Sequence, residues 1–127
     1  MILLELEETV STPKVFIDKD RFSISGETRP ENPRKFYDQV FDALNKVDEL
    51  LADGSISSYE FLFDLEYIST SSLVMLKKLF NELRTIQDKY ENVSSAWLYY
   101  EMDEGMKLLG EELRLITKVD MEVKQRP

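Results

Sequence analysis

Residues 59–90 read YEFLFDLEYISTSSLVMLKKLFNELRTIQDKY, and this stretch decides the fold. Over residues 59–65, aromatic and aliphatic side chains recur at every second position, which predicts a strand with one face fully buried. From residue 73 to 90, apolar side chains recur every three or four positions, which predicts an amphipathic helix. Four consecutive hydroxyl side chains, at residues 69–72, separate the strand from the helix.

This hydroxyl run has two explanations, and the sequence leaves both open. Ser and Thr are preferred N-caps, and one of them accepting a hydrogen bond from the first helical turn stabilises by about 1 kcal/mol. One cap needs one residue, however, and four are present. A hydroxyl at a helix N-terminus is also a good position for a phosphate, because unpaired N–H groups and the helix dipole favour negative charge there. The run therefore indicates helix capping, a regulatory phosphorylation site, or both.

Toward the N-terminus, the pattern predicts further strands and a helix. Residues 3–10 are expected to form an edge strand or an ordered arm, and residues 14–18 and 22–26 a β-hairpin with a polar four-residue turn. Asn32 followed by Pro33 is a helix-start signal, since Asn can cap and Pro is tolerated at the first helical position. The expected apolar stripe of this helix is Phe36, Val40, Phe41, Leu44, Val47 and Leu51.

Toward the C-terminus, residues 93–100 are apolar on both faces, which predicts an interior strand. Gly105 and Gly110 would weaken the helix that follows by about 1 kcal/mol each if they are interior to it. Residues 115–123 return to β-like alternation, and residues 124–127 are expected to be a tail. The expected apolar stripe of the third helix is Met102, Met106, Leu109 and Leu113.

Strands that alternate with helices in this way predict βαβ units with right-handed connections. We therefore expect a single α/β domain over residues 1–127, with a core of about residues 11–123. Its mixed sheet would carry an N-terminal β-hairpin, with about three helices packed on the sheet. The hydroxyl run would lie at the carboxyl end of a strand, the edge of an open α/β sheet where ligand and partner sites gather.

Composition excludes several classes of function. His and Cys are both absent, which removes imidazole bases, Ser-His-Asp triads, thiol nucleophiles and metal sites built from these residues. The formal net charge of −9 argues against nucleic acid or an anionic membrane surface as a partner. No apolar run approaches the roughly 18 residues of a membrane span. An acidic residue also follows the N-terminus too closely to leave the apolar segment that a secretion signal needs. We therefore expect a cytoplasmic protein without direct membrane insertion.

Other groups of residues also have more than one explanation. The loop at residues 29–33, Arg-Pro-Glu-Asn-Pro, either presents contacts or only sets turn geometry. Three aromatic residues of the interior strand either line a ligand pocket or pack in the core; they are Trp97, Tyr99 and Tyr100. An acidic group could hold Mg²⁺, meet a basic partner or form an ordinary charged surface. Its members are Glu101, Asp103, Glu104, Glu111 and Glu112.

A family likeness runs through nearly the whole chain, over about residues 11–119. It is carried by STP at 11–13, FSISGE at 22–27, RPENP at 29–33, FYD at 36–38, DLEYISTSS at 64–72, WLYY at 97–100, DEGM at 103–106 and GE at 110–111. Together these segments resemble the SiaC-family regulatory phosphoprotein domain. More distantly, the strand, hydroxyl turn and helix are similar to STAS-type anti-sigma factor antagonists, which are phosphorylated at the same structural place.

The resemblance implies a STAS-like fold and phosphorylation of the threonine in the turn, which is Thr70 in this sequence; Ser69 stands where the family commonly has Asn. It implies a SiaB-type kinase and a membrane-linked, PP2C-like SiaA-type phosphatase as partners. It further implies that the unphosphorylated form activates a diguanylate cyclase of the SiaD type or another output protein, in the control of aggregation and biofilm formation. The kinase would bring ATP and Mg²⁺, so no cofactor is expected on this chain.

We therefore expect a non-enzymatic signalling module that is switched by phosphorylation at Thr70. The residues expected to share its partner-binding surface are Tyr67, Ser69, Ser71, Ser72, Arg29, Pro30, Glu31 and Asn32. The alternatives are a STAS-type small-ligand sensor with an aromatic pocket around Trp97, and a partner-switching protein similar to anti-sigma factor antagonists. A carboxylate-dependent enzyme would need an acidic pair that converges on a cleft.

Overall fold

A computed structural model describes all 127 residues and contains one six-stranded sheet with strand order β1-β2-β3-β4-β5-β6. The strands are β1 (Ile2–Leu6), β2 (Lys14–Asp18), β3 (Arg21–Thr28), β4 (Tyr59–Ile68), β5 (Val93–Tyr99) and β6 (Glu122–Gln125). The helices are α1 (Pro33–Ala52), α2 (Thr70–Lys89) and α3 (Glu104–Thr117). The expected α/β class, with an N-terminal hairpin, a mixed sheet and three helices, is confirmed.

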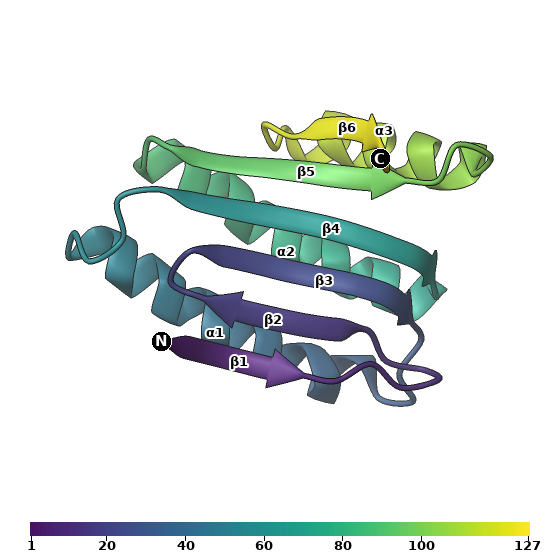
Figure 1. Ribbon diagram of the computed structural model, residues 1–127, viewed down its shortest axis with the longest axis horizontal. Coiled ribbons are helices and arrows are strands. Elements are labelled where there is room, and N and C mark those ends of the chain that lie inside the picture. The colour runs from purple at the N-terminus through teal and green to yellow at the C-terminus, as the bar shows by residue number, and fades with distance from the viewer.

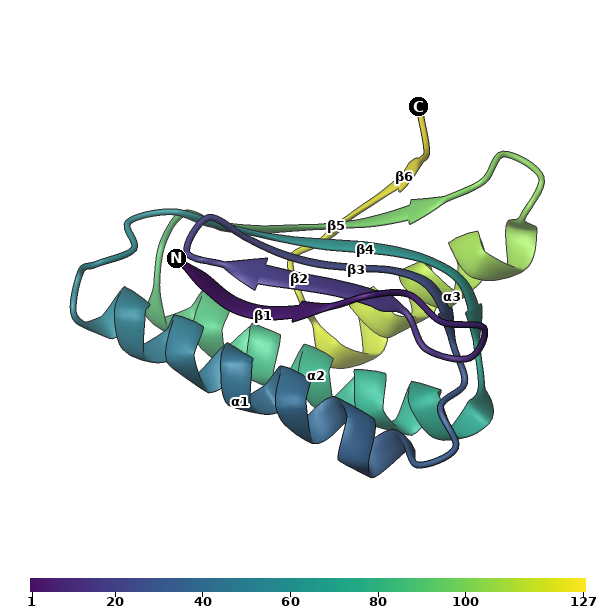
Figure 2. The ribbon, with the colours of Figure 1, turned by 60° about the horizontal axis from the view of Figure 1, so that its bottom comes forward.

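All three helices lie on one face of the sheet (Figures 1 and 2). Strands β1, β2 and β3 pair antiparallel, whereas β3, β4, β5 and β6 pair parallel. Each helix connects two neighbouring parallel strands in the same direction across the sheet, and right-handed connections then place every helix on the same side. The opposite face carries no helix (Figure 2). None of the helices is long and apolar enough to cross a membrane.

The core lies between the sheet and the helices, and the predicted alternation in β4 builds its centre. Every second residue from Tyr59 to Leu65 is buried, as the period of two predicts. The ring of Phe63 lies 4.8 Å from that of Phe80 in α2 and 6.0 Å from that of Trp97 in β5, measured between centroids. Burial of such aromatic side chains dominates the stabilisation of a core of this size.

Helix α1 begins where the sequence predicts, and Val40, Leu44, Val47 and Leu51 of its expected stripe are buried, but two other members of the stripe are not. The side chain of Asn32 accepts a hydrogen bond from the Lys35 amide at 3.1 Å, so the expected cap is confirmed. Phe36 and Phe41 were expected on the buried stripe, yet they are only partly buried, and Tyr37 is fully buried instead. Tyr37 can be buried because its hydroxyl finds a hydrogen-bond partner inside the protein.

The C-terminal region corrects two further expectations. Met102 is not on the stripe of α3: it precedes the N-cap Asp103 and is 90% exposed. Residues 115–117 were expected to begin a strand, but they form the last turn of α3, whose Thr117 hydroxyl donates to the carbonyl of Leu113. The last strand is therefore β6, and it takes in two residues that were expected to be tail.

Gly110, expected to weaken α3, lies against Trp97 of β5. Trp97 is 1% exposed, and its Nε1 donates to the Met106 carbonyl at 3.0 Å. A Cβ added at Gly110 would lie 2.7 Å from that Nε1, which is closer than van der Waals contact allows. The absent side chain is therefore what lets α3 pack on Trp97.

We predict that Gly110→Ala lowers the free energy of unfolding by about 1–3 kcal/mol, because the extra methyl group overlaps a buried indole ring. Urea unfolding followed by the fluorescence of Trp97, the only tryptophan of the chain, measures the effect. Gly105→Ala is the matched control in the same helix, since its Cβ would meet only a side-chain oxygen of Asp103 at 3.6 Å. Equal stability of the two variants would contradict the prediction.

Candidate functional site

The carboxyl ends of β3, β4 and β5 lie along one edge of the sheet, at the right of Figure 1. We call this the carboxyl edge. The parallel register pairs Glu27 with Tyr67 and Thr28 with Ile68, after a register shift beside Gly26, whose φ is +97°. The loop that follows β3 therefore lies next to the hydroxyl turn that follows β4. The Ser69 amide joins them by donating to the Thr28 carbonyl at 2.9 Å.

Each hydroxyl of the turn has a different environment. Ser69 is the N-cap of α2, because its Oγ accepts a hydrogen bond from the Ser72 amide at 3.2 Å. Ser72 is fully buried. Thr70 and Ser71 are exposed in the first turn of the helix, and their hydroxyls take no part in the hydrogen bonds of the turn. One residue does the capping, as expected, and two hydroxyls are left facing solvent.

A buried chain of hydroxyl groups holds the turn in place. The hydroxyl of Thr28 donates to Ser72 Oγ at 3.0 Å, and Ser69 Oγ donates to the same oxygen at 3.0 Å. The Tyr37 hydroxyl lies 2.7 Å from Thr28 Oγ1. Since Thr28 gives its proton to Ser72, Tyr37 donates to Thr28. The chain joins the end of β3, the first turns of α1 and the start of α2.

The eight residues expected to bind partners differ in their exposure to solvent. Ser72 and Pro30 are buried, so the folded chain does not present their side chains on its surface. Ser72 is drawn inward by Thr28, a residue 44 positions away in the sequence. Ser69 is partly exposed but acts as the helix cap. The exposed members of the set are Arg29, Glu31, Asn32, Tyr67 and Ser71.

The loop after β3 is held by contacts of its own. The backbone amide of Arg29 donates to the Ser11 carbonyl, and its guanidinium Nη2 donates to the Val10 carbonyl, both at 2.9 Å. Asn32 uses its side-chain oxygen to cap α1. Both explanations of the loop therefore have support: it sets local geometry, and it exposes Arg29 and Glu31 beside the turn.

Three apolar residues near this edge are exposed, which their positions in the sequence did not predict. Val74 lies one turn after Thr70 in α2 and is 52% exposed, and Tyr100 and Met102 follow β5 and are 45% and 90% exposed. Val74 is an apolar side chain off the expected stripe of its helix, whereas Met102 was expected on the stripe of the third helix and Tyr100 among the aromatic residues of the interior strand. Exposed apolar groups that gather beside polar ones mark interaction surfaces more often than single scattered residues do.

Two other candidate sites do not form. Trp97 lies in the core between Phe63 and Phe80, with an indole N–H that is already hydrogen-bonded; of its two explanations, core packing is confirmed and a ligand pocket around it does not form. The acidic group of residues 101–112 contains no set of three or more carboxylates placed to hold a metal ion. Its acids lie instead on exposed or partly exposed surface.

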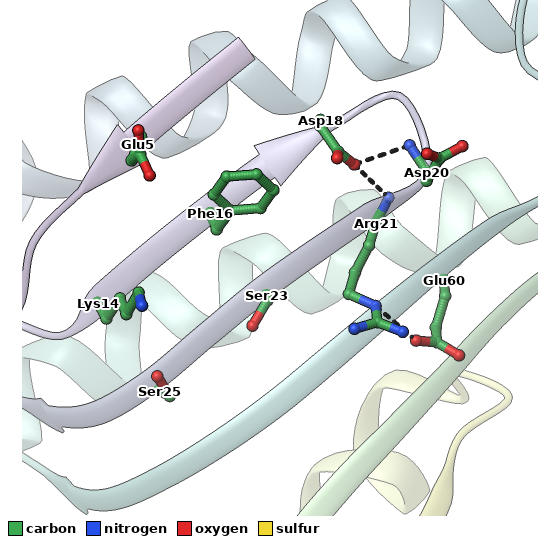
Figure 3. A pocket seen from close by; sticks show the side chains of 9 residues that line it. All are labelled: Glu5, Lys14, Phe16, Asp18, Asp20, Arg21, Ser23, Ser25 and Glu60. Atoms are coloured by element: carbon green, nitrogen blue, oxygen red, sulfur yellow. Dashed lines mark hydrogen bonds and ion pairs between the residues drawn. The ribbon is translucent and has the colours of Figure 1, made fainter. Parts of the chain in front are cut away.

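A cavity of about 700 Å³ lies on the helix-free face of the sheet, as Figure 3 shows. Its carboxylates have separate roles: Asp18 accepts hydrogen bonds from the amides of Asp20 and Arg21, and Glu60 pairs with the Arg21 guanidinium at 2.9 Å. They therefore do not form the converging acidic pair that a carboxylate-dependent enzyme would need. Polar side chains across this cavity allow the uncovered face of the sheet to meet water.

A family model and a curated relative both match most of the chain. The model of the SiaC family of regulatory phosphoproteins matches residues 6–126. An uncharacterized protein of Pseudomonas aeruginosa (strain UCBPP-PA14) is 32% identical over 113 residues, which is 87% of this chain and 86% of that protein.

Solved structures show the same fold. A chain in the crystal structure of the diguanylate cyclase SiaD in complex with its activator SiaC from Pseudomonas aeruginosa matches with a TM-score of 0.85 and 28% identity, over 97% of this chain and 99% of that chain. The crystal structure of apo-SiaC from the same organism matches with a TM-score of 0.80 and 27% identity, over 95% of this chain and 97% of that chain.

We predict that Ser72→Ala costs about 1–3 kcal/mol of stability, because it leaves the buried Thr28 hydroxyl without its acceptor. Ser71→Ala is the matched control, since the neighbouring hydroxyl is exposed and its loss should change stability by no more than about 0.5 kcal/mol. Thermal and urea unfolding measure both. A Ser72→Ala variant as stable as Ser71→Ala would show that the hydroxyl chain does not stabilise the turn.

The buried Tyr37 predicts a loss of stability in alkali. Burial raises the pKa of Tyr37 to about 12, whereas a tyrosine in an unfolded chain titrates near pH 10. The folded state therefore favours the neutral phenol, and this contribution is complete below about pH 10 and is lost as the pH rises to about 12. The gap in unfolding free energy between wild type and Tyr37→Phe should narrow over that interval. A gap that stays constant between pH 10 and pH 12 would contradict the prediction.

Proposed function

Because the chain belongs to the SiaC family of regulatory phosphoproteins, we propose that Thr70 is its phosphorylated residue and that the phosphate controls which partner binds the carboxyl edge. The observation that supports the proposal is that the hydroxyl residues of the turn differ in burial and hydrogen bonding. Ser69 caps the helix and Ser72 is buried, whereas Thr70 is exposed and free of hydrogen bonds within the turn. Ser71 shares this exposure, and the resemblance to the family turn selects Thr70.

A phosphate on Thr70 acts on the surface and leaves the helix folded. It adds a charge of about −1.5 to −2 at the first residue of α2, where the helix dipole favours negative charge. Tyr67 and Val74 expose apolar surface on either side of it in the chain. A partner that covers these side chains would also have to desolvate the phosphate, which is costly for a charged group. Phosphorylation therefore releases the partner.

The output partner is, by this proposal, a diguanylate cyclase or a comparable protein that the unphosphorylated form activates. The match to a chain in the SiaD complex with its activator SiaC supports this choice. A SiaB-type kinase would add the phosphate, using its own ATP and Mg²⁺, and a PP2C-like SiaA-type phosphatase would remove it. This chain would serve in turn as substrate of the two enzymes and as activator of the output protein, in the control of biofilm formation and aggregation.

We predict that mass spectrometry of the protein from its native host finds a phosphate on Thr70, and that Thr70→Ala abolishes it. Thr70→Glu should keep the circular dichroism of the wild type yet bind the cognate cyclase at least about tenfold more weakly.

Ser71→Glu is the matched control: it adds the same charge one residue away, and so it tests whether the effect on binding depends on the position of the charge. A phosphate mapped to Ser71 would keep the switch and correct the residue. A chain that is unmodified in every growth state, or a large loss of helix in Thr70→Glu, would contradict the proposal.

A further inference from the structure

Helix α3 exposes a second apolar surface on its outer side. Leu108 is 61% exposed, Leu115 78% and Ile116 58%. Leu108 and Leu115 are seven positions apart, so they lie on one stripe of the helix, two turns from each other. The buried residues of α3, among them Met106 and Leu113, lie on the opposite side. An apolar stripe that points to solvent is unusual enough on a small domain to indicate a binding surface.

Carboxylates flank this stripe and have no ionic partner. Glu104, Glu111 and Glu112 are on the same side of α3, and none of them forms an ion pair. The two basic residues within the helix make contacts away from these carboxylates. Lys107 lies over the ring of Tyr99, 5.9 Å from its centroid, and Arg114 donates to the Met121 carbonyl at 3.2 Å.

The surface is hollowed rather than flat. An open depression of about 760 Å³ runs along the helix, and it is lined by Leu108, Glu111, Glu112, Arg114, Leu115 and Lys118. We call the set Leu108, Glu111, Glu112, Leu115 and Ile116 the outer face of α3.

The outer face is separate from the carboxyl edge. Helix α3 lies at one side of the helix layer, next to α2 and beneath β5 and β6 (Figures 1 and 2). It begins beside the carboxyl end of β5 and runs back along that strand, because β6 then pairs parallel with β5. Leu115 and Ile116 are therefore at the end of α3 that is far from the turn carrying Thr70.

We propose that the outer face of α3 binds an amphipathic helix of a partner protein, one with aliphatic side chains along one stripe and Arg or Lys on its flanks. The apolar stripe supplies buried area, and the unpaired carboxylates supply charge complementarity. This contact goes beyond the phosphorylation switch and does not depend on it.

The charges on this face argue against a second copy of the chain as the occupant. In an antiparallel pair that brings Leu108 of one copy against Leu115 of the other, Glu111 would face Glu112 across the contact. In a parallel pair each glutamate would face itself. Like charges that meet in a desolvated contact oppose association. The same carboxylates repel the anionic headgroups of a membrane surface.

The test uses three helical peptides of about 18 residues, a length that spans the outer face. The first has leucines on one stripe and arginines on both flanks. The second has the same composition with its leucines spread around the helix, and the third replaces the arginines by glutamates. Fluorescence anisotropy measures their binding to the full chain, and amide chemical shifts locate it. The first peptide should bind at least about tenfold tighter than the other two, with shifts concentrated in residues 104–118.

Two double variants make the result specific. Leu108→Ser with Leu115→Ser should weaken the first peptide at least about tenfold, and urea unfolding should stay close to wild type because both side chains are exposed. Glu111→Lys with Glu112→Lys should reverse the preference toward the glutamate peptide. Equal binding of all three peptides, shifts located elsewhere, or unchanged binding by the serine variant would each overturn the proposal. Sedimentation that shows self-association of the chain, lost in the serine variant, would assign the face to a second copy instead.

Discussion

The buried oxygen of Ser72 is the point on which the arrangement of the carboxyl edge depends. It accepts hydrogen bonds from Thr28 at the end of β3 and from Ser69 at the start of α2, while Tyr37 of α1 donates to Thr28. A buried hydroxyl without a partner is costly, so these groups must stay together as long as the protein is folded. By turning Ser69 and Ser72 inward, the network leaves Thr70 facing solvent. The fold therefore exposes the hydroxyl of Thr70, the phosphate acceptor that we propose, on a turn that is held by hydrogen bonds beneath it.

The one-sided sheet explains why the molecule has several distinct surfaces. Helices cover a single face, so the strands bury aromatic side chains toward them and present serines and charged residues to water on the other side. The carboxyl edge combines exposed hydroxyls with exposed apolar side chains, and a charge placed there changes whether those side chains can be covered. The outer face of α3 combines apolar side chains with unpaired carboxylates, and its charge is permanent. One surface would suit the switched contact that we propose, and the other a contact that does not depend on phosphorylation.

The net charge of −9 gives these surfaces a common preference for partners with basic groups. The phosphate proposed at Thr70 would add negative charge to a chain that already carries a large excess of it. Its effect is nevertheless local, since charges separated by more than about 8–10 Å in solution are largely screened at physiological salt. For the same reason, the switch at Thr70 need not disturb a partner bound at the far end of α3.

The sequence by itself determined the elements whose signals are local. The alternation at residues 59–65, the Asn32-Pro33 start of α1 and the Ser-rich start of α2 each depend on neighbours a few positions away, and each was read correctly. Only the tertiary structure decided which of those residues point inward. Ser72 is buried by a partner 44 positions away, Tyr37 replaces Phe36 in the core because its hydroxyl meets Thr28, and Gly110 is needed because Trp97 lies against it. Periodicity records which side chains are apolar, whereas burial depends on which distant groups the folded chain brings alongside them.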